Sequence, residues 1–163
     1  TVTVDMGMPK LPESLKEKIV IDGQEISFTY IETGNPHCVI FLPNDVDENF
    51  FKSFGPKIEK HSRFLKGTNV EFTHVISDKE INCRVWERGC GPTLACGTGA
   101  CATLIAACIN ELSGVSAKIN LPGGPLNVFW DKDKTGSVFL NGPAAFVYTG
   151  NYNLNPKLVC AGS

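Results

Sequence analysis

Residues 91–109, GPTLACGTGACATLIAACI, place Cys96 directly before the start of a glycine-punctuated helix. The N-terminus of a helix presents unpaired backbone N–H groups and a partial positive charge, so it attracts anions and favours ionisation of a thiol. Gly97 and Gly99 allow the backbone amides to approach a carboxylate or phosphate closely, and Thr98 adds a hydroxyl donor. We interpret Cys96 as a candidate thiolate beside an anion site. The alternative is a small buried hydrophobic residue, as most cysteines are.

A second group of candidate residues closes the run EINCRVWERG. Alternation along a strand puts Glu87 on the same face as Ile81, Cys83 and Val85, so its carboxylate continues an apolar row into the interior and must be paired or used. Arg88 follows at once, and its planar guanidinium suits a substrate carboxylate. A short loop then leads back to the start of the helix. The alternative is an ion pair between the two side chains at the end of the strand.

Two further polar residues stand at the start of predicted strands. His37 follows an Asn35–Pro36 turn and opens the apolar run HCVIFL, which places its ring near the rim of the sheet. Asn69 opens the run NVEF in the same way. For both residues the alternative to a role in the site is structural: a hydrogen-bonded histidine, and an asparagine that satisfies a turn.

The cysteines do not predict a disulfide framework or a metal site. Seven is an odd number, and a chain of 163 residues does not need cross-links, so we expect reduced thiols. Zinc sites use regular spacings such as C-x2-C, which the chain lacks. We expect no metal, although several possible ligands lie along the sequence: His37, Cys38, Cys83, Cys90, Cys96 and Cys101. Cys101 and Cys108 share one helical face and are expected in the core.

Composition and charge narrow the functional classes. The chain is 42% hydrophobic and 20% charged with a net charge of −2, which argues against binding to nucleic acid or to a membrane surface. No run has the length of a membrane span or the pattern of a signal peptide, so we expect a cytoplasmic protein. The first residue is Thr1, and the chain opens directly in the strand-like TVTVDMG. We therefore expect it to be the latter part of a longer polypeptide.

Short strand-like runs dominate the chain and predict eight to ten strands. These runs are residues 1–6, 18–21, 25–32, 37–42, 69–77, 80–87, 117–121, 126–130, 137–141 and 144–149. Two segments predict helices instead. Residues 47–64 are amphipathic and begin at a predicted cap, Asp47, and residues 97–112 are rich in Ala, Leu and Ile, with Gly114 as the expected stop.

The second helix decides the predicted architecture. Between Ala100 and Ile109 only Thr103 is polar, so the helix has no face for solvent and must be surrounded. We predict an α+β fold in which a strongly curved mixed sheet or barrel wraps one central apolar helix, with the amphipathic helix packed outside. Residues 1–150 are expected to form this domain. Residues 151–163 are expected to form a tail, either packed toward a missing N-terminal domain or disordered.

Three motifs, in this order, resemble the C-terminal half of the diaminopimelate epimerase family: GNPHCV, TNVEF and WERGCGPTLACGTGAC. The runs VDMGMP and LPGGPLNVFW extend the similarity over nearly the whole chain. Proline racemases have a related cysteine–glycine–threonine loop but lack the GNPHC and NVEF companions. The resemblance implies a fold of two pseudo-symmetric domains, each a curved sheet around a central helix, with substrate between them.

The resemblance also implies a chemistry. One cysteine removes the α-proton of diaminopimelate while a second protonates the opposite face, and this interconverts the LL and meso forms in lysine and peptidoglycan precursor synthesis without PLP or metal. Cys96 matches the C-terminal catalytic cysteine, and His37 and Glu87 match residues that assist proton handling. The positions that match substrate-binding residues of the family are Asn35, Asn69, Glu87, Arg88, Gly97 and Thr98.

Two departures qualify this expectation. The family's partner cysteine, in a cysteine–glycine–asparagine–glycine loop, is absent from these residues, so the chain alone is expected to be inactive without an N-terminal domain of the same polypeptide. Cys90 and Pro92 are less usual in the loop after Arg88. The alternatives are another amino-acid racemase or epimerase of the same superfold, and a non-catalytic domain that binds a small anion. A homodimer also remains open.

Overall fold

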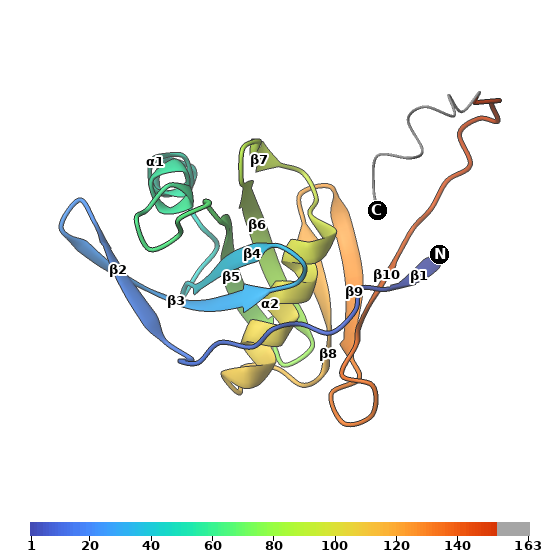
Figure 1. Cartoon of the computed structure of the whole chain (residues 1–163), viewed down its shortest axis with the longest axis horizontal. Coiled ribbons are helices and arrows are strands. Elements are labelled where there is room, and N and C mark those ends of the chain that lie inside the picture. The colour runs from blue at the N-terminus through green and yellow to red at the C-terminus, as the bar shows by residue number, and fades with distance from the viewer. Residues whose placement is uncertain (153–163) are drawn as a thin grey trace, which may run out of the picture.

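The computed structural model describes residues 1–152, which form one mixed sheet and two helices (Figure 1). The strands are β1 (Val2–Asp5), β2 (Glu17–Ile21), β3 (Gln24–Glu32), β4 (Pro36–Phe41), β5 (Asn69–Ser77), β6 (Glu80–Glu87), β7 (Gly91–Thr93), β8 (Ser116–Leu121), β9 (Gly124–Trp130) and β10 (Val138–Gly142). The helices are α1 (Glu48–Glu59) and α2 (Gly97–Ile109). The strand order is β1-β10-β9-β8-β6-β5-β4-β3-β2, and β7 pairs separately with β6.

Two parallel pairs, β4 with β5 and β6 with β8, interrupt an otherwise antiparallel sheet. Parallel neighbours need a crossover connection, and each helix supplies one. Both crossovers step in the same direction along the sheet, but the two pairs run in opposite directions. Right-handed connections therefore put the two helices on opposite faces of the sheet. Two separate core clusters, one around each helix, agree with this arrangement.

Helix α2 lies inside the curve of the sheet, as predicted (Figure 1). Every residue from Gly99 to Ala107 is buried, and the helix contacts β3, β4, β5, β6, β8, β9 and β10. Its small side chains let the strands approach closely on all sides. The expected α+β fold with a central apolar helix is confirmed, and the wrapped helix has its N-terminus at one rim of the sheet.

Helix α1 packs on the outer face of the sheet, also as predicted. The Asp47 side chain accepts hydrogen bonds from the backbone N–H groups of Asn49 and Phe50, which confirms the predicted cap. Buried Phe51 and Ile58 pack in the cluster on this face. The helix ends at Glu59, so it is shorter than the predicted range 47–64.

Three local predictions are wrong. Residues 144–149 form no strand: β10 already pairs with β9 and β1, and Phe146 is 85% exposed. The short strand β7 was not predicted, because Gly91 and Pro92 read as a turn. Helix α2 ends at Ile109 rather than near Gly114, because Glu111 adopts the left-handed conformation with φ 60°.

The predicted tail, residues 151–163, lies outside the described residues except for its first two positions, which have no regular structure. Within residues 1–152, neither helix combines the length and the apolar character needed to cross a membrane.

Candidate active site

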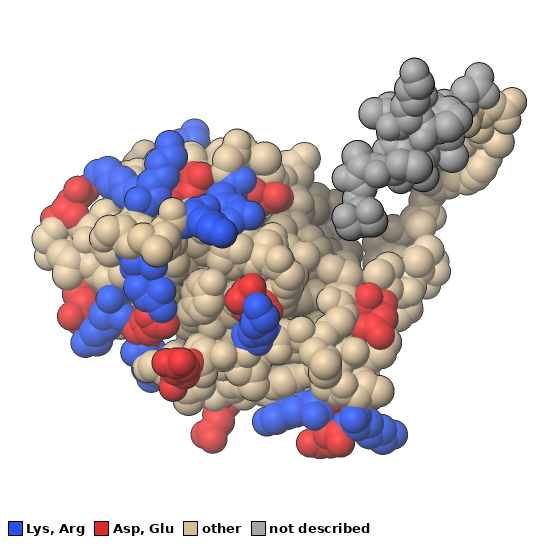
Figure 2. Space-filling model, viewed as in Figure 1, with Lys and Arg blue, Asp and Glu red and all other residues tan. Residues whose placement is uncertain are grey.

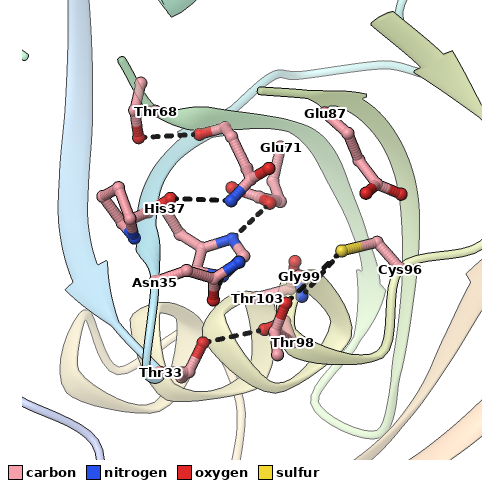
Figure 3. A network of polar contacts seen from close by, with 12 residues as sticks. Thr33, Asn35, His37, Thr68, Glu71, Glu87, Cys96, Thr98, Gly99 and Thr103 are labelled. Carbon is pink, nitrogen blue, oxygen red and sulfur yellow. Dashed lines mark hydrogen bonds and ion pairs between the residues drawn. The ribbon is translucent and has the colours of Figure 1, made fainter. Parts of the chain in front are cut away.

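Cys96 is the N-cap residue of α2, with extended backbone angles of φ −140° and ψ 110°. Its Sγ accepts a hydrogen bond from the Gly99 backbone N–H at 3.3 Å, and the Thr98 hydroxyl lies 3.5 Å from the sulfur (Figure 3). Cys96 is 8% exposed. The sulfur therefore sits at the positive end of a helix, beside a hydroxyl and in a nearly dry environment.

The charge state of this thiol differs from the prediction. We expected the helix N-terminus to make Cys96 ionise more easily, but burial raises the pKa of its thiol above the ordinary value. The hydrogen bonds from Thr98 and Gly99 lower the pKa, whereas negative charge on Glu71 or Glu87 raises it further. Desolvation outweighs the two hydrogen bonds, so Cys96 holds its proton in this structure.

Glu87 and Arg88 leave the end of β6 in different directions. The Thr93 hydroxyl donates to Glu87 Oε1 at 2.6 Å, and the half-buried carboxylate points toward the Cys96 sulfur (Figure 3). The Arg88 guanidinium donates instead to the Lys66 carbonyl at 3.3 Å. The described residues contain no ion pair between Glu87 and Arg88, which was the alternative interpretation. Strand β7 therefore contributes to the site, because it carries the Thr93 hydroxyl that orients Glu87.

Asn69 connects two parts of the site. Its side-chain N–H donates to the Pro36 carbonyl at 2.9 Å, and its Oδ1 accepts from the Arg88 backbone N–H at 2.9 Å. Both polar groups of the side chain are therefore engaged within the protein. Asn69 thus links the start of β4 to Arg88, the residue after β6, and fixes the position of the Arg88 backbone.

His37 is held between two side chains on the α2 side of the sheet. Its Nδ1 lies 2.6 Å from Glu71 Oε1, and its Nε2 lies 2.8 Å from Asn35 Oδ1 (Figure 3). The His37 and Glu71 side chains are fully buried. Burial raises the pKa of Glu71, while contact with His37 opposes that shift.

Glu71 was missed by the sequence analysis. The available signal was a carboxylate flanked by Val70 and Phe72 inside a strand, where no turn or surface explains it. A second missed residue is Glu59, the last residue of α1. It is 8% exposed and accepts from Trp86 Nε1 at 2.8 Å and from the Gly89 backbone N–H at 2.9 Å. Glu59 therefore anchors the turn that carries Arg88, and nothing in its local sequence indicates this.

The N-terminus of α2, the end of β6 and the starts of β4 and β5 thus contribute the predicted residues, although the Arg88 guanidinium is bonded to the Lys66 carbonyl. Cys90 is exposed in the turn after β6, and Cys83 and Cys101 are buried in the core. Within residues 1–152, no group of three or more His, Cys, Asp or Glu side chains has the arrangement of a metal site. The site combines a protonated thiol, a helix N-terminus and a neighbouring carboxylate, an arrangement that can transfer a proton beside an anionic group.

The family model and the curated relatives that match this chain point to the same family. A family model described as diaminopimelate epimerase matches residues 29–147. The chain is 44% identical over 160 residues to the diaminopimelate epimerase of Desulfitobacterium hafniense, an alignment that covers 91% of this chain and 56% of the relative. It is 43% identical to that of Geobacillus thermodenitrificans, with 93% and 56% covered. The chain therefore spans somewhat more than half the length of these curated relatives.

Solved structures share the fold at low identity. A probable proline racemase from Agrobacterium radiobacter K84, solved with bound carbonate, aligns with a TM-score of 0.64 and 14% identity over 94% of this chain and 54% of its own. A hydroxyproline epimerase from Agrobacterium vitis, solved with trans-4-hydroxy-L-proline, aligns with a TM-score of 0.59 and 15% identity, covering 85% and 48%. At this identity the likeness concerns the fold alone.

Proposed function

This chain belongs to the diaminopimelate epimerase family, and from that premise we propose that it contributes one of two proton-transfer groups to the interconversion of LL- and meso-diaminopimelate. The observation that carries the proposal is Cys96 at the N-cap of the buried helix α2, with its sulfur bonded to the Gly99 N–H. The longer polypeptide of the family supplies the other group. The chain alone is then inactive, because its own residues include no partner cysteine loop.

The helix end stabilises the charge that develops in the reaction. An α-proton next to a carboxylate is a very weak acid, so the carbanion must spread its charge onto the carboxylate oxygens. The Gly97 and Thr98 N–H groups, the first of α2, have no carbonyl partner within the helix and are available to those oxygens, and Gly97 allows a close approach. Thr98 adds its hydroxyl to the same carboxylate. Excluding water strengthens each of these contacts.

The protonated state of Cys96 gives it a defined role in one direction of the reaction. A base on the opposite face removes the α-proton, and the electrons of the C–H bond pass into the carboxylate-stabilised carbanion. The Cys96 S–H then protonates the carbon on the near face and becomes a thiolate. In the reverse direction that thiolate is the base. The Glu87 carboxylate faces the sulfur and favours its neutral form.

The far end of diaminopimelate carries a second carboxylate and ammonium group. Arg88 can bind the distal carboxylate with two parallel hydrogen bonds. We assign Asn35 to the same head group, and Asn69 to holding Arg88 through its backbone. No PLP and no metal enter this scheme. A biosynthetic role in lysine and peptidoglycan precursors further implies a cytoplasmic protein whose partner is the N-terminal domain of the same polypeptide.

The test uses the full polypeptide that carries this chain. We expect deuterium from D2O to enter the α-position of LL- and meso-diaminopimelate, and the Cys96→Ala variant to lose this exchange by at least about a thousandfold, since it lacks the transferring atom. Cys108→Ala is the matched control, because Cys108 lies at the far end of the same helix. Its exchange rate should stay within about twofold of the unchanged protein. Exchange that persists in Cys96→Ala would show that the thiol does not transfer the proton.

A further inference from the structure

Asn35, His37 and Glu71 form a continuous hydrogen-bonded chain beneath the site, and neither the family comparison nor the sequence gives Glu71 a part in it. Glu71 lies on β5 opposite Val39 of the parallel strand β4, so its carboxyl group meets the His37 ring on the α2 side. The His37 ring meets the Asn35 amide oxygen on its other edge. The two inner members are 0% exposed.

The positions of the protons in this chain follow from the donors and acceptors. The Asn35 Oδ1 has no hydrogen, so His37 Nε2 must carry the proton of the 2.8 Å contact. At 2.6 Å, one further proton lies between His37 Nδ1 and Glu71 Oε1. The pair is therefore neutral overall whichever atom holds the shared proton. Neither ring nitrogen remains available to accept a proton from Cys96 or from substrate.

We propose that Glu71 is a positioning residue that acts through His37 to fix the Asn35 amide with its N–H2 group available to substrate. Because the shared proton occupies the Nδ1 side of the ring, His37 Nε2 stays protonated and donates to the Asn35 amide oxygen. The Asn35 amide nitrogen then remains as a free donor. No hydrogen bond from Asn35 Nδ2 is found within residues 1–152. A free N–H2 group suits a carboxylate, whereas a free amide oxygen would repel one. His37 then transmits an orientation and does not itself transfer protons.

One other feature supports a neutral Glu71. Its second oxygen, Oε2, is buried without a hydrogen-bond partner in the described residues, which costs a carboxylate far more than the carbonyl oxygen of an acid. Glu71 also lies against the first turn of α2: a Cβ at Gly99 would stand 2.9 Å from Oε1 and 3.2 Å from the Cys96 sulfur. A negative charge there would oppose formation of the Cys96 thiolate.

Two substitutions of Glu71 separate positioning from general stability. In Glu71→Gln the new amide N–H2 donates to Nδ1, so Nε2 keeps its proton and Asn35 keeps its orientation. In Glu71→Met nothing fixes the tautomer, and His37 can accept from the Asn35 N–H2, which turns the amide oxygen toward substrate. This inference rests on the proposed function where it speaks of substrate, and on geometry alone where it speaks of the His37 tautomer.

The kinetic arm uses the full polypeptide and diaminopimelate. We expect Glu71→Met to raise KM about tenfold, the value of one hydrogen bond to a charged group, with a change in kcat below about threefold. Glu71→Gln should retain both constants within about threefold. In an Asn35→Ala background Glu71→Met should have no further effect, because the route through Asn35 is already lost. Equal losses in Gln and Met variants, or an undiminished loss in that background, would overturn the proposal.

The spectroscopic arm needs no turnover and so stands if the proposed function fails. In the same polypeptide labelled with 15N at histidine, with His37 assigned by a His37→Gln variant, we expect Nε2 to be protonated in the unchanged protein and in Glu71→Gln. In Glu71→Met the proton should no longer be confined to Nε2, so a mixture of the two neutral tautomers is expected. If the Met variant does not fold, the other two spectra decide: an unprotonated Nε2 in either one contradicts the proposal.

Discussion

Opposing effects meet at the Cys96 sulfur. The Gly99 N–H and the Thr98 hydroxyl both stabilise a thiolate, whereas the dry surroundings and any negative charge on Glu71 or Glu87 stabilise the thiol. The second set prevails, and the pKa is raised. We therefore expect Cys96 to ionise as it protonates the substrate, rather than before substrate binds. The balance depends on Glu71 and Glu87, which arrive from other strands.

Gly99 tests how tightly this residue group is packed. Its substitution by Ala would place a Cβ 2.9 Å from Glu71 Oε1 and 3.3 Å from the Cys96 Cβ. Since both groups belong to the site, we expect Gly99→Ala to lower the α-hydrogen exchange rate at least about tenfold, as expected for displacement of reacting groups by a fraction of an ångström. Stability should change by less than about 1 kcal/mol, because alanine favours a helix and offsets part of the strain.

Gly114→Ala is the control for that experiment. A Cβ at Gly114 meets nothing within 4 Å, and the residue lies beyond the opposite end of α2. Its exchange rate should be unchanged in the same deuterium assay. An unchanged rate in Gly99→Ala as well would mean that the first turn of the helix is looser than the contacts indicate.

At the scale of elements, α1 positions the site from the opposite face of the sheet. The Trp86 ring packs directly over Gly55, and the Trp86 N–H and the Gly89 N–H both donate to Glu59. Because Trp86 precedes Glu87 and Arg88 in the chain, the helix controls the direction in which β6 ends. A helix with no residue in the site thus helps to orient two residues that are.

Gly55→Ala should disturb this contact. The added Cβ would lie 2.7 Å from the Trp86 ring, which cannot move without leaving Glu59. We expect a loss of about 1–3 kcal/mol in the free energy of unfolding, measured by urea denaturation, together with a shift in tryptophan fluorescence. Asp47→Ala is the comparison: it removes the cap of the same helix at a cost of about 1 kcal/mol without touching Trp86. Matching fluorescence in the two variants would argue against the packing account.

How far the elements could be predicted depends on whether their signal is local. The run of apolar residues in α2 has no polar face, so its burial and the curved sheet around it followed from the sequence. The partners of Glu71 and Glu59 are 34, 27 and 30 residues away, so the sequence alone could not pair them. Glu71 carried a local signal, since its carboxylate lies between Val70 and Phe72 in a strand, whereas nothing near Glu59 marks it. Residues 144–149 have a strand pattern, but a pattern cannot reveal that the preceding strand, β10, is already paired on both sides, with β9 and with β1.

At the scale of the whole molecule, most charged side chains lie on the surface whereas most described thiols are buried. Positive and negative side chains lie interspersed on the face shown in Figure 2, without a patch of one sign, in keeping with the net charge of −2. Of the six cysteines within residues 1–152, four are buried. Burial raises the pKa of Cys38 and Cys83 well above the ordinary value and that of Cys101 to about 12. These groups make stability depend on pH on the alkaline side.

The sign follows from proton counting. The unfolded chain releases its thiol protons from about pH 8.5 upward, while the folded chain holds them to much higher pH. Stability is therefore full below about pH 8.5 and falls as pH rises toward the folded pKa values, by about 1.4 kcal/mol per pH unit for each buried thiol. Urea denaturation between pH 7.5 and 10 under reducing conditions measures this slope. Cys101→Ala should make it shallower by one thiol's share, and an identical slope would mean that Cys101 titrates normally.

The pairing of β1 with β10 has a consequence for biosynthesis. Thr3 and Asn141 are hydrogen-bonded across the sheet although 138 residues separate them. A ribosome adding roughly 5–20 residues per second needs about 7 to 28 seconds to travel between them. During that interval β1, with its apolar Val2 and Val4, has been synthesised but has no partner strand to pair with. The segment made first in this chain is thus among the last to join its sheet, and it is the segment that chaperones and proteases meet for longest.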